Sequence, residues 1–104
     1  MNRTKLRLTE VAVSDIREQA DWYEQRSGHA LARRWENNVT AALIRIEKNP
    51  RLGAKCGFRA DELQGVRRMS IGGFPRHLIF YDDGKGKALI LRVIHGARDL
   101  ESLL

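Results

Sequence analysis

The chain has 104 residues, enough for one domain, and 42% of them are hydrophobic, which is compatible with a buried core. Its single cysteine, Cys56, cannot form an internal disulfide, and no apolar run approaches the roughly 20 residues that a membrane helix needs. Residues 1–7 lack the apolar segment of a secretory signal peptide. We therefore expect one cytoplasmic domain over residues 1–104, without a membrane segment.

The net charge is +6, and 14 arginines with five lysines outweigh 13 acidic residues. Arginine is suited to bidentate binding of carboxylates and phosphates. The charge balance therefore indicates an anionic partner, either nucleic acid or an acidic polypeptide, and does not choose between them. Acidic residues gather in 10–24 and basic residues in 51–81, so we expect an acidic first helix followed by a basic loop and strands.

The N-terminal half predicts a strand and two helices. Residues 4–9 alternate charged and apolar side chains, as in a strand with one buried face, and Thr9 is a suitable N-cap. Apolar residues spaced by three and four predict a helix over 10–26, ended by Gly28. A second apolar stripe predicts another helix that ends before Pro50, because proline cannot continue it. Helices joined so closely form an antiparallel hairpin.

The C-terminal half predicts three antiparallel strands, over residues 66–71, 76–82 and 88–95. Residues 72–75 have the composition of a turn, and Asp83-Gly84 is a hairpin signal.

Residues 50–64 show no period and are expected to form an exposed basic loop, while the tail 97–104 forms a short helical turn or an extended arm. The predicted fold is an α+β two-layer domain of order β-α-α-β-β-β, with an antiparallel meander sheet, the N-terminal strand at its edge and the helical hairpin on one face. The other sheet face has no second layer in this prediction, and we expect function there.

No pattern predicts a metal site, a cofactor or a nucleophile. The candidate ligands lack metal-site spacing and are scattered over the chain: His29, His77, His95 and Cys56. Gly72-Gly73 lacks the lysine and hydroxyl residue of a phosphate-binding loop, and we interpret it as a turn.

Polar side chains concentrate in the predicted sheet and at its rim: Arg67, Arg68, Arg76, His77, Tyr81, Arg92, His95 and Arg98. Strand alternation places His77, Ile79 and Tyr81 on one face, and Arg76, Leu78 and Phe80 on the other. Such a surface could cleave RNA without a metal or hold an acidic peptide. It could also be a solvated basic face with Tyr81 in the core, and the residues leave these interpretations open.

The two tryptophans have different expected roles. Trp35 lies on the apolar stripe of the second helix and is predicted to be core. Trp22 lies beside the stripe of the first helix, and we interpret it first as core and alternatively as a partly exposed contact residue.

Segments along the whole chain, in order, resemble the ParE branch of the RelE/ParE toxin superfamily. Upstream, the segments are Asp15-Ile16, Tyr23, Gly28, residues 31–35, and Asn49-Pro50 with Gly53. Downstream they are residues 63–68, residues 73–81, and residues 91–99, whose ending His95-Gly96-Ala97-Arg98-Asp99 is the most specific part. The resemblance implies the same β-α-α-β-β-β fold.

The resemblance also implies a bacterial toxin of a type II toxin–antitoxin system, of the kind that includes plasmid stabilisation proteins. In such systems a ParD-like or similar antitoxin binds operator DNA through one half, and its other half is disordered until it folds over the toxin. ParE-like members poison DNA gyrase. RelE-like members cut messenger RNA on the ribosome.

Carrying over the RelE-like nuclease residues gives an incomplete set. RelE-like nucleases have closely spaced basic residues on the first meander strand, to which Arg67 or Arg68 corresponds. They also have an arginine after the last strand, to which Arg98 corresponds. The arginine of the second meander strand falls on Leu78, unless a one-residue shift brings Arg76 or His77 there. RelE-like nucleases also have a tyrosine or histidine near the C-terminus. The tail 100–104 has neither, and His95 lies before the position where this residue is expected.

Because the set of nuclease residues is incomplete, we favour a gyrase inhibitor with no catalytic residues of its own. The alternatives are a metal-free endoribonuclease using Arg67, Arg68, His95 and Arg98, and a homologue that binds antitoxin but has lost toxicity. The resemblance and the charge together predict that the antitoxin contacts Trp22, Arg67, Arg68, Arg76 and Arg92.

Overall fold

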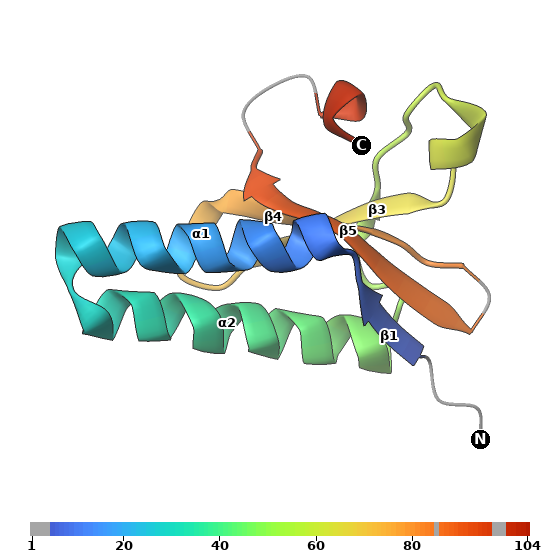
Figure 1. Cartoon of the computed structure of the whole chain (residues 1–104). Helices are drawn as coiled ribbons and strands as arrows, with labels where there is room; N and C mark the ends of the chain where they lie inside the picture. Colours follow the sequence, from blue (N-terminus) through green and yellow to red (C-terminus); the bar gives the residue numbers. More distant parts are fainter. Residues whose placement is uncertain (1–4, 85, 97–99) are drawn as a thin grey trace.

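The computed structural model describes residues 5–84, 86–96 and 100–104. The elements follow in the order β1 (Lys5–Leu8), α1 (Glu10–Ser27), α2 (His29–Lys48), β2 (Ala54–Lys55), η1 (Asp61–Leu63), β3 (Val66–Ile71), β4 (Phe74–Asp82), β5 (Lys87–His95) and η2 (Glu101–Leu103), where η is a 3₁₀ turn. Figure 1 shows the two long helices side by side against one face of the sheet. The predicted α+β architecture is therefore confirmed.

The sheet has the strand order β1-β5-β4-β3-β2. Strands β2 to β5 are antiparallel neighbours, whereas β1 runs parallel to β5, with Lys5 opposite Lys87 and Leu8 opposite Ile90. The N-terminal strand thus lies at the sheet edge, as predicted. The parallel pairing follows from the helical hairpin, which carries the chain back along the sheet before the meander begins.

The ends of α1 are set by the residues that the sequence indicated. The Thr9 hydroxyl accepts a hydrogen bond from the Ala12 amide at 3.0 Å and donates one to the Leu91 carbonyl at 3.0 Å, so the N-cap also ties the helix to β5. At the other end Gly28 has φ +93°, a conformation that favours glycine, and its amide donates to the Glu24 carbonyl.

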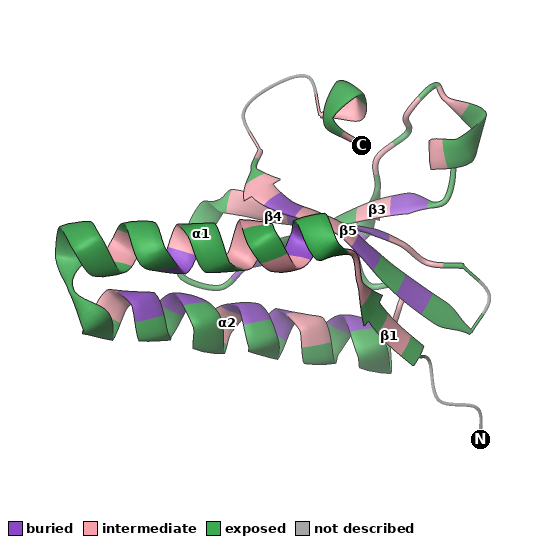
Figure 2. Ribbon diagram, viewed as in Figure 1, coloured by how far each residue is buried: buried purple, intermediate pink, exposed green. Residues whose placement is uncertain are grey.

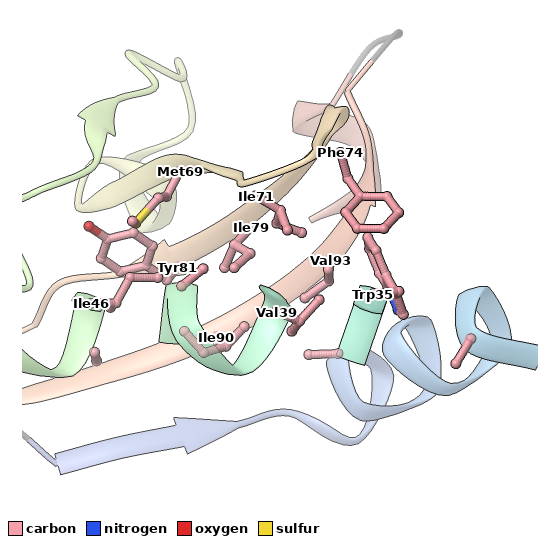
Figure 3. Close-up of a cluster of buried hydrophobic side chains, with 14 residues drawn as sticks. Trp35, Val39, Ile46, Met69, Ile71, Phe74, Ile79, Tyr81, Ile90 and Val93 are labelled. Carbon is pink, nitrogen blue, oxygen red and sulfur yellow. The ribbon is translucent and has the colours of Figure 1, made fainter. Parts of the chain in front are cut away.

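The core lies between the helical hairpin and the sheet, where Figure 2 shows the buried residues of α2 facing the strands. Trp35, Val39 and Ile46 of α2 pack toward Ile79 and Tyr81 in the cluster drawn in Figure 3. The indole N–H of Trp35 donates to the Ile16 carbonyl at 3.1 Å, so this fully buried ring has its polar atom paired. The prediction that Trp35 is core is confirmed.

Residues 50–64 are more ordered than the exposed loop we expected. They contain β2 and η1, and Gly53 is buried. The cause is Tyr81, whose hydroxyl donates to the Pro50 carbonyl at 2.7 Å and accepts from the Gly53 amide at 2.9 Å. This tyrosine faces the helices and is fully buried, so of the interpretations left open the structure supports Tyr81 as a core residue.

The sheet face away from the helices is also less open than we expected. Phe80 is fully buried, with its ring centroid 6.5 Å from that of Phe58 in the loop after β2. The Glu101 carboxylate accepts hydrogen bonds from the amides of Arg59 and Ala60, which fastens the C-terminal turn to the same loop. The expectation of an uncovered second face was therefore wrong over this part of the sheet, because loop and tail cover it.

Two smaller expectations also need correction. Only Gly72 and Gly73 form the turn before β4, since Phe74 and Pro75 are already part of that strand. Trp22 is 49% exposed, so our first interpretation of it as core was wrong. Across residues 5–84, 86–96 and 100–104, no helix combines the length and apolar character needed to cross a membrane.

Substituting Gly53 tests the contact between the loop and the sheet. A Cβ at this position would lie 2.6 Å from the Arg68 carbonyl oxygen and 2.7 Å from the Tyr81 hydroxyl. We expect Gly53→Ala to lower the free energy of unfolding by about 1–3 kcal/mol, measured by urea denaturation, because the crowded atoms must move apart. The control is Gly72→Ala, where nothing lies within 4 Å of the new Cβ. Equal stability of the two variants would contradict the packing described.

Candidate functional site

A cleft of about 800 Å³ opens between α1 and the adjoining ends of β4 and β5. On the helix side it is lined by Glu18, Gln19, Trp22 and Tyr23. On the strand side it is lined by Phe74, Pro75, Arg76, His77 and residues 92–95. Its walls are therefore aromatic, with charged groups at the margins, as is typical of sites that bind a ligand or a partner side chain.

One end of the cleft is closed by Asp15 of α1 and Arg92 of β5. The guanidinium donates two hydrogen bonds to the carboxylate, from Nε at 2.8 Å and from a terminal nitrogen at 3.0 Å. The same carboxylate accepts the Val93 amide at 3.0 Å. The hydrogen bonds that Arg92 donates to the Asp15 carboxylate raise the pKa of Arg92 above its usual value.

A pair of histidines forms the floor at the other end. His77 and His95 lie opposite each other on β4 and β5, with ring centroids 5.5 Å apart. Beneath them, the centroid of the Trp35 indole lies 4.9 Å from that of His77. Burial lowers the pKa of His77, and the neighbouring His95 lowers it further.

Trp22 projects from α1 at the rim of the cleft. Its ring meets Tyr23 edge to face at 5.6 Å, and the Arg26 guanidinium lies 4.8 Å from the ring centroid. The half of this indole that remains exposed is a large apolar surface supported by its neighbours.

The remaining basic candidates on β3 lie away from the cleft. Arg67 faces the helices, pairs with Asp83, and donates to the Gly53 carbonyl at 2.8 Å, so it fastens the loop after α2. Arg68 is exposed on the opposite sheet face, where it lies beside Cys56. Burial raises the pKa of Cys56 more than Arg68 lowers it, which disfavours a reactive thiolate.

The structure thus separates the predicted site residues into groups. Trp22, Arg76, Arg92 and His95 line one cleft, while Arg67 and Arg68 occupy opposite faces of β3. Arg67 lies opposite Tyr81, and His95 lies opposite His77. Tyr81 and His77 are four positions apart along β4, which separates the two pairs by roughly 13 Å at the usual strand rise. Arg98 falls outside the described residues.

Sequence reasoning did not single out two central residues of the site. Asp15 was noticed only as an acidic residue of the first helix and through the family resemblance. His77 was named on one sheet face, among scattered candidate ligands and as an alternative nuclease position, but not as a residue of the predicted site. The helical spacing of Asp15, Glu18 and Trp22 was a usable signal, because residues at i, i+3 and i+7 share a helix face. Within the described part of the chain, no three His, Cys, Asp or Glu side chains are grouped closely enough to hold a metal.

Comparison with known proteins gives consistent matches. Residues 6–100 match the sequence profile of the family described as "ParE toxin of type II toxin-antitoxin system, parDE". The fold is similar to a chain of the chromosomal ParDE TA system from P. aeruginosa, with a TM-score of 0.75 and 17% identity, covering 91% of this chain and 98% of that chain. It is also similar to a chain of the RelBE2 toxin–antitoxin complex from Mycobacterium tuberculosis, with a TM-score of 0.59 and 24% identity, covering 94% and 97%. No curated protein sequence matches.

Neutralising Asp15 tests whether its carboxylate holds α1 on β5. In Asp15→Asn one donor from Arg92 or Val93 loses its acceptor, so we expect the free energy of unfolding to fall by about 1.5–3 kcal/mol in urea denaturation. The matched control is Glu24→Gln, which breaks the exposed pair with His29 and should cost less than about 1 kcal/mol. A loss no larger than that of the control would contradict a structural role for Asp15.

Proposed function

Because this chain belongs to the ParE toxin family of type II toxin–antitoxin systems, we propose that it inhibits DNA gyrase and is neutralised by a cognate antitoxin. The family match over residues 6–100 is the observation that carries the proposal. In this proposal the chain works by binding rather than by catalysis, and it reaches operator DNA only through the antitoxin.

The placement of the basic residues supports a non-enzymatic mode of action. General acid–base cleavage of RNA needs its groups to converge on one reacting phosphate. Arg67 is held by Asp83 and the Gly53 carbonyl, Arg68 lies on the other sheet face, and His95 lies at the far end of the strands. This separation of three residues of the nuclease hypothesis favours the proposal of a non-enzymatic inhibitor.

An antitoxin partner is supported by charge and by the similar structures. The net charge of +6 suits an acidic polypeptide, and both similar chains come from structures titled as toxin–antitoxin systems or complexes. Of the contact residues we propose, Trp22, Arg76 and Arg92 line the cleft, Arg68 is exposed elsewhere on the sheet, and Arg67 contributes through the fold.

The decisive measurement is DNA supercoiling by gyrase, titrated with the purified chain. We expect inhibition with accumulation of cleaved DNA, relieved when the cognate antitoxin is added first. A ribosome-dependent messenger RNA cleavage assay runs in parallel with the same protein. Unaffected gyrase with cleaved messenger RNA would overturn the proposal in favour of an endoribonuclease, and inactivity in both assays would indicate a homologue that has lost toxicity.

The antitoxin surface is tested by calorimetry on variants of exposed residues. We expect Trp22→Ala and Arg76→Ala each to weaken antitoxin binding by about tenfold or more, since tryptophan and arginine are frequent hot spots of interfaces. Lys87→Ala is the control, because this exposed residue lies at the opposite end of β5 from the cleft. Arg67 and Arg92 are left unchanged, since their ion pairs hold the fold. Wild-type affinity in both variants would show that the antitoxin binds elsewhere.

A further inference from the structure

The histidine pair in the cleft has hydrogen-bonding groups without a partner among the described residues. Neither imidazole of His77 and His95 forms a hydrogen bond with any described residue. No fully buried side-chain nitrogen or oxygen in the described chain lacks a partner, so the unpaired ring nitrogens of the half-buried His77 are exposed to solvent, and this residue lines the cleft. Two neighbouring imidazoles therefore offer their nitrogens to whatever enters.

None of the charged side chains described around the histidine pair binds either imidazole. On α1, Asp15 is bound by Arg92, and Glu18 lies in the cleft wall without a hydrogen bond to either imidazole. On α2 the neighbour is Trp35, which carries no charge. On β4, Arg76 borders the cleft, although strand alternation points its side chain away from the face that carries His77.

The rest of the cleft is apolar and aromatic. Tyr23 and Phe74 lie with ring centroids 5.5 Å apart, and Trp22 extends this surface to the rim. A ligand that suits both parts combines an apolar or aromatic group with an anion, since two imidazoles can donate hydrogen bonds to one carboxylate once they are protonated.

We propose that His77 and His95 form a receptor for a carboxylate, supplied by an acidic side chain of the partner polypeptide beside an apolar residue that packs on Trp22, Tyr23 and Phe74. Naming the antitoxin as that polypeptide rests on the function proposed above. The carboxylate site itself depends only on the geometry of the cleft.

The proposal has a defined pH dependence. In the free protein, burial and His95 lower the pKa of His77, so this imidazole is mostly neutral at pH 7. A carboxylate seated between the rings favours their charged forms, which raises the pKa of the bound state above that of the free state. Binding therefore takes up protons, is strongest below the free-state pKa and weakens as the pH rises through the bound-state pKa.

The test uses 3-phenylpropionate as the probe, followed by NMR of the imidazole nitrogens. The chain has only three histidines, and the third, His29, lies on the helical hairpin beside Glu24, so it reports unspecific effects. We expect the probe to shift the titration of His77 and His95 upward but not that of His29. Its affinity should be about tenfold higher near about pH 5.5 than near about pH 8, because one pKa unit corresponds to one factor of ten.

Controls separate the charge from the apolar contact. The uncharged amide 3-phenylpropanamide should leave both titrations in place. His95→Gln should reduce the pH dependence of probe binding, because only His77 can then take up a proton, whereas His29→Gln should keep the pH dependence of the unmodified chain. His95 is exposed, so its substitution leaves the core intact. The proposal is overturned if the probe leaves both imidazoles unchanged up to its solubility limit, or if it shifts His29 equally.

Calorimetry with the antitoxin, in two buffers of different ionisation enthalpy, then tests whether the antitoxin supplies the carboxylate. Proton uptake that is smaller in His95→Gln than in the unmodified chain would support a carboxylate of the antitoxin at this site. Tight antitoxin binding without proton uptake would overturn the assignment to the antitoxin while leaving the toxin function intact. If the chain binds the probe as expected but has no effect on gyrase, the carboxylate site is supported and the proposed gyrase inhibition is overturned.

Discussion

The arrangement of the molecule depends on one carboxylate, that of Asp15. Strand β1 covers the edge of β5 only as far as Ile90, and beyond this point α1 takes its place. Asp15 accepts the Val93 amide, a hydrogen bond that a neighbouring strand would otherwise make, and holds the Arg92 guanidinium at the same time. The helix is thereby fixed beside the sheet, and Trp22, two turns further along, is placed at the mouth of the cleft.

Both helices and the four longer strands could be predicted from the sequence because each carries its own local signal, whereas β2 and η1 carry none. Apolar spacing marked both helices, and Thr9 and Gly28 marked the ends of α1. Alternation placed His77 and Tyr81 on one sheet face, and the structure shows that the helices pack on this face. These signals depend on neighbours a few residues away, and the structure confirms them to within one or two residues except around the β3–β4 turn.

The site could not be predicted in the same way because its residues meet through strand register and long-range contacts. A bulge in the β4–β5 pairing lies between Phe80 and Tyr81, and only with its extra residue does His95 stand opposite His77. The ion pair of Arg67 with Asp83 and the hydroxyl of Tyr81 on the loop after α2 join residues 16 to 31 positions apart. Composition showed that the chain is basic, but not which arginines are already held by the fold.

The parallel pairing of β1 with β5 also bears on how the protein forms as it is synthesised. Thr9 is bound to Leu91, 82 positions later, so the first strand has no partner until the last strand has left the ribosome. Contacts of such separation slow folding, since a long loop must close before they form. The helical hairpin and the β3–β4 pair can form early, but the sheet closes last, and a chain interrupted before β5 can assemble neither the Asp15 contact nor the cleft.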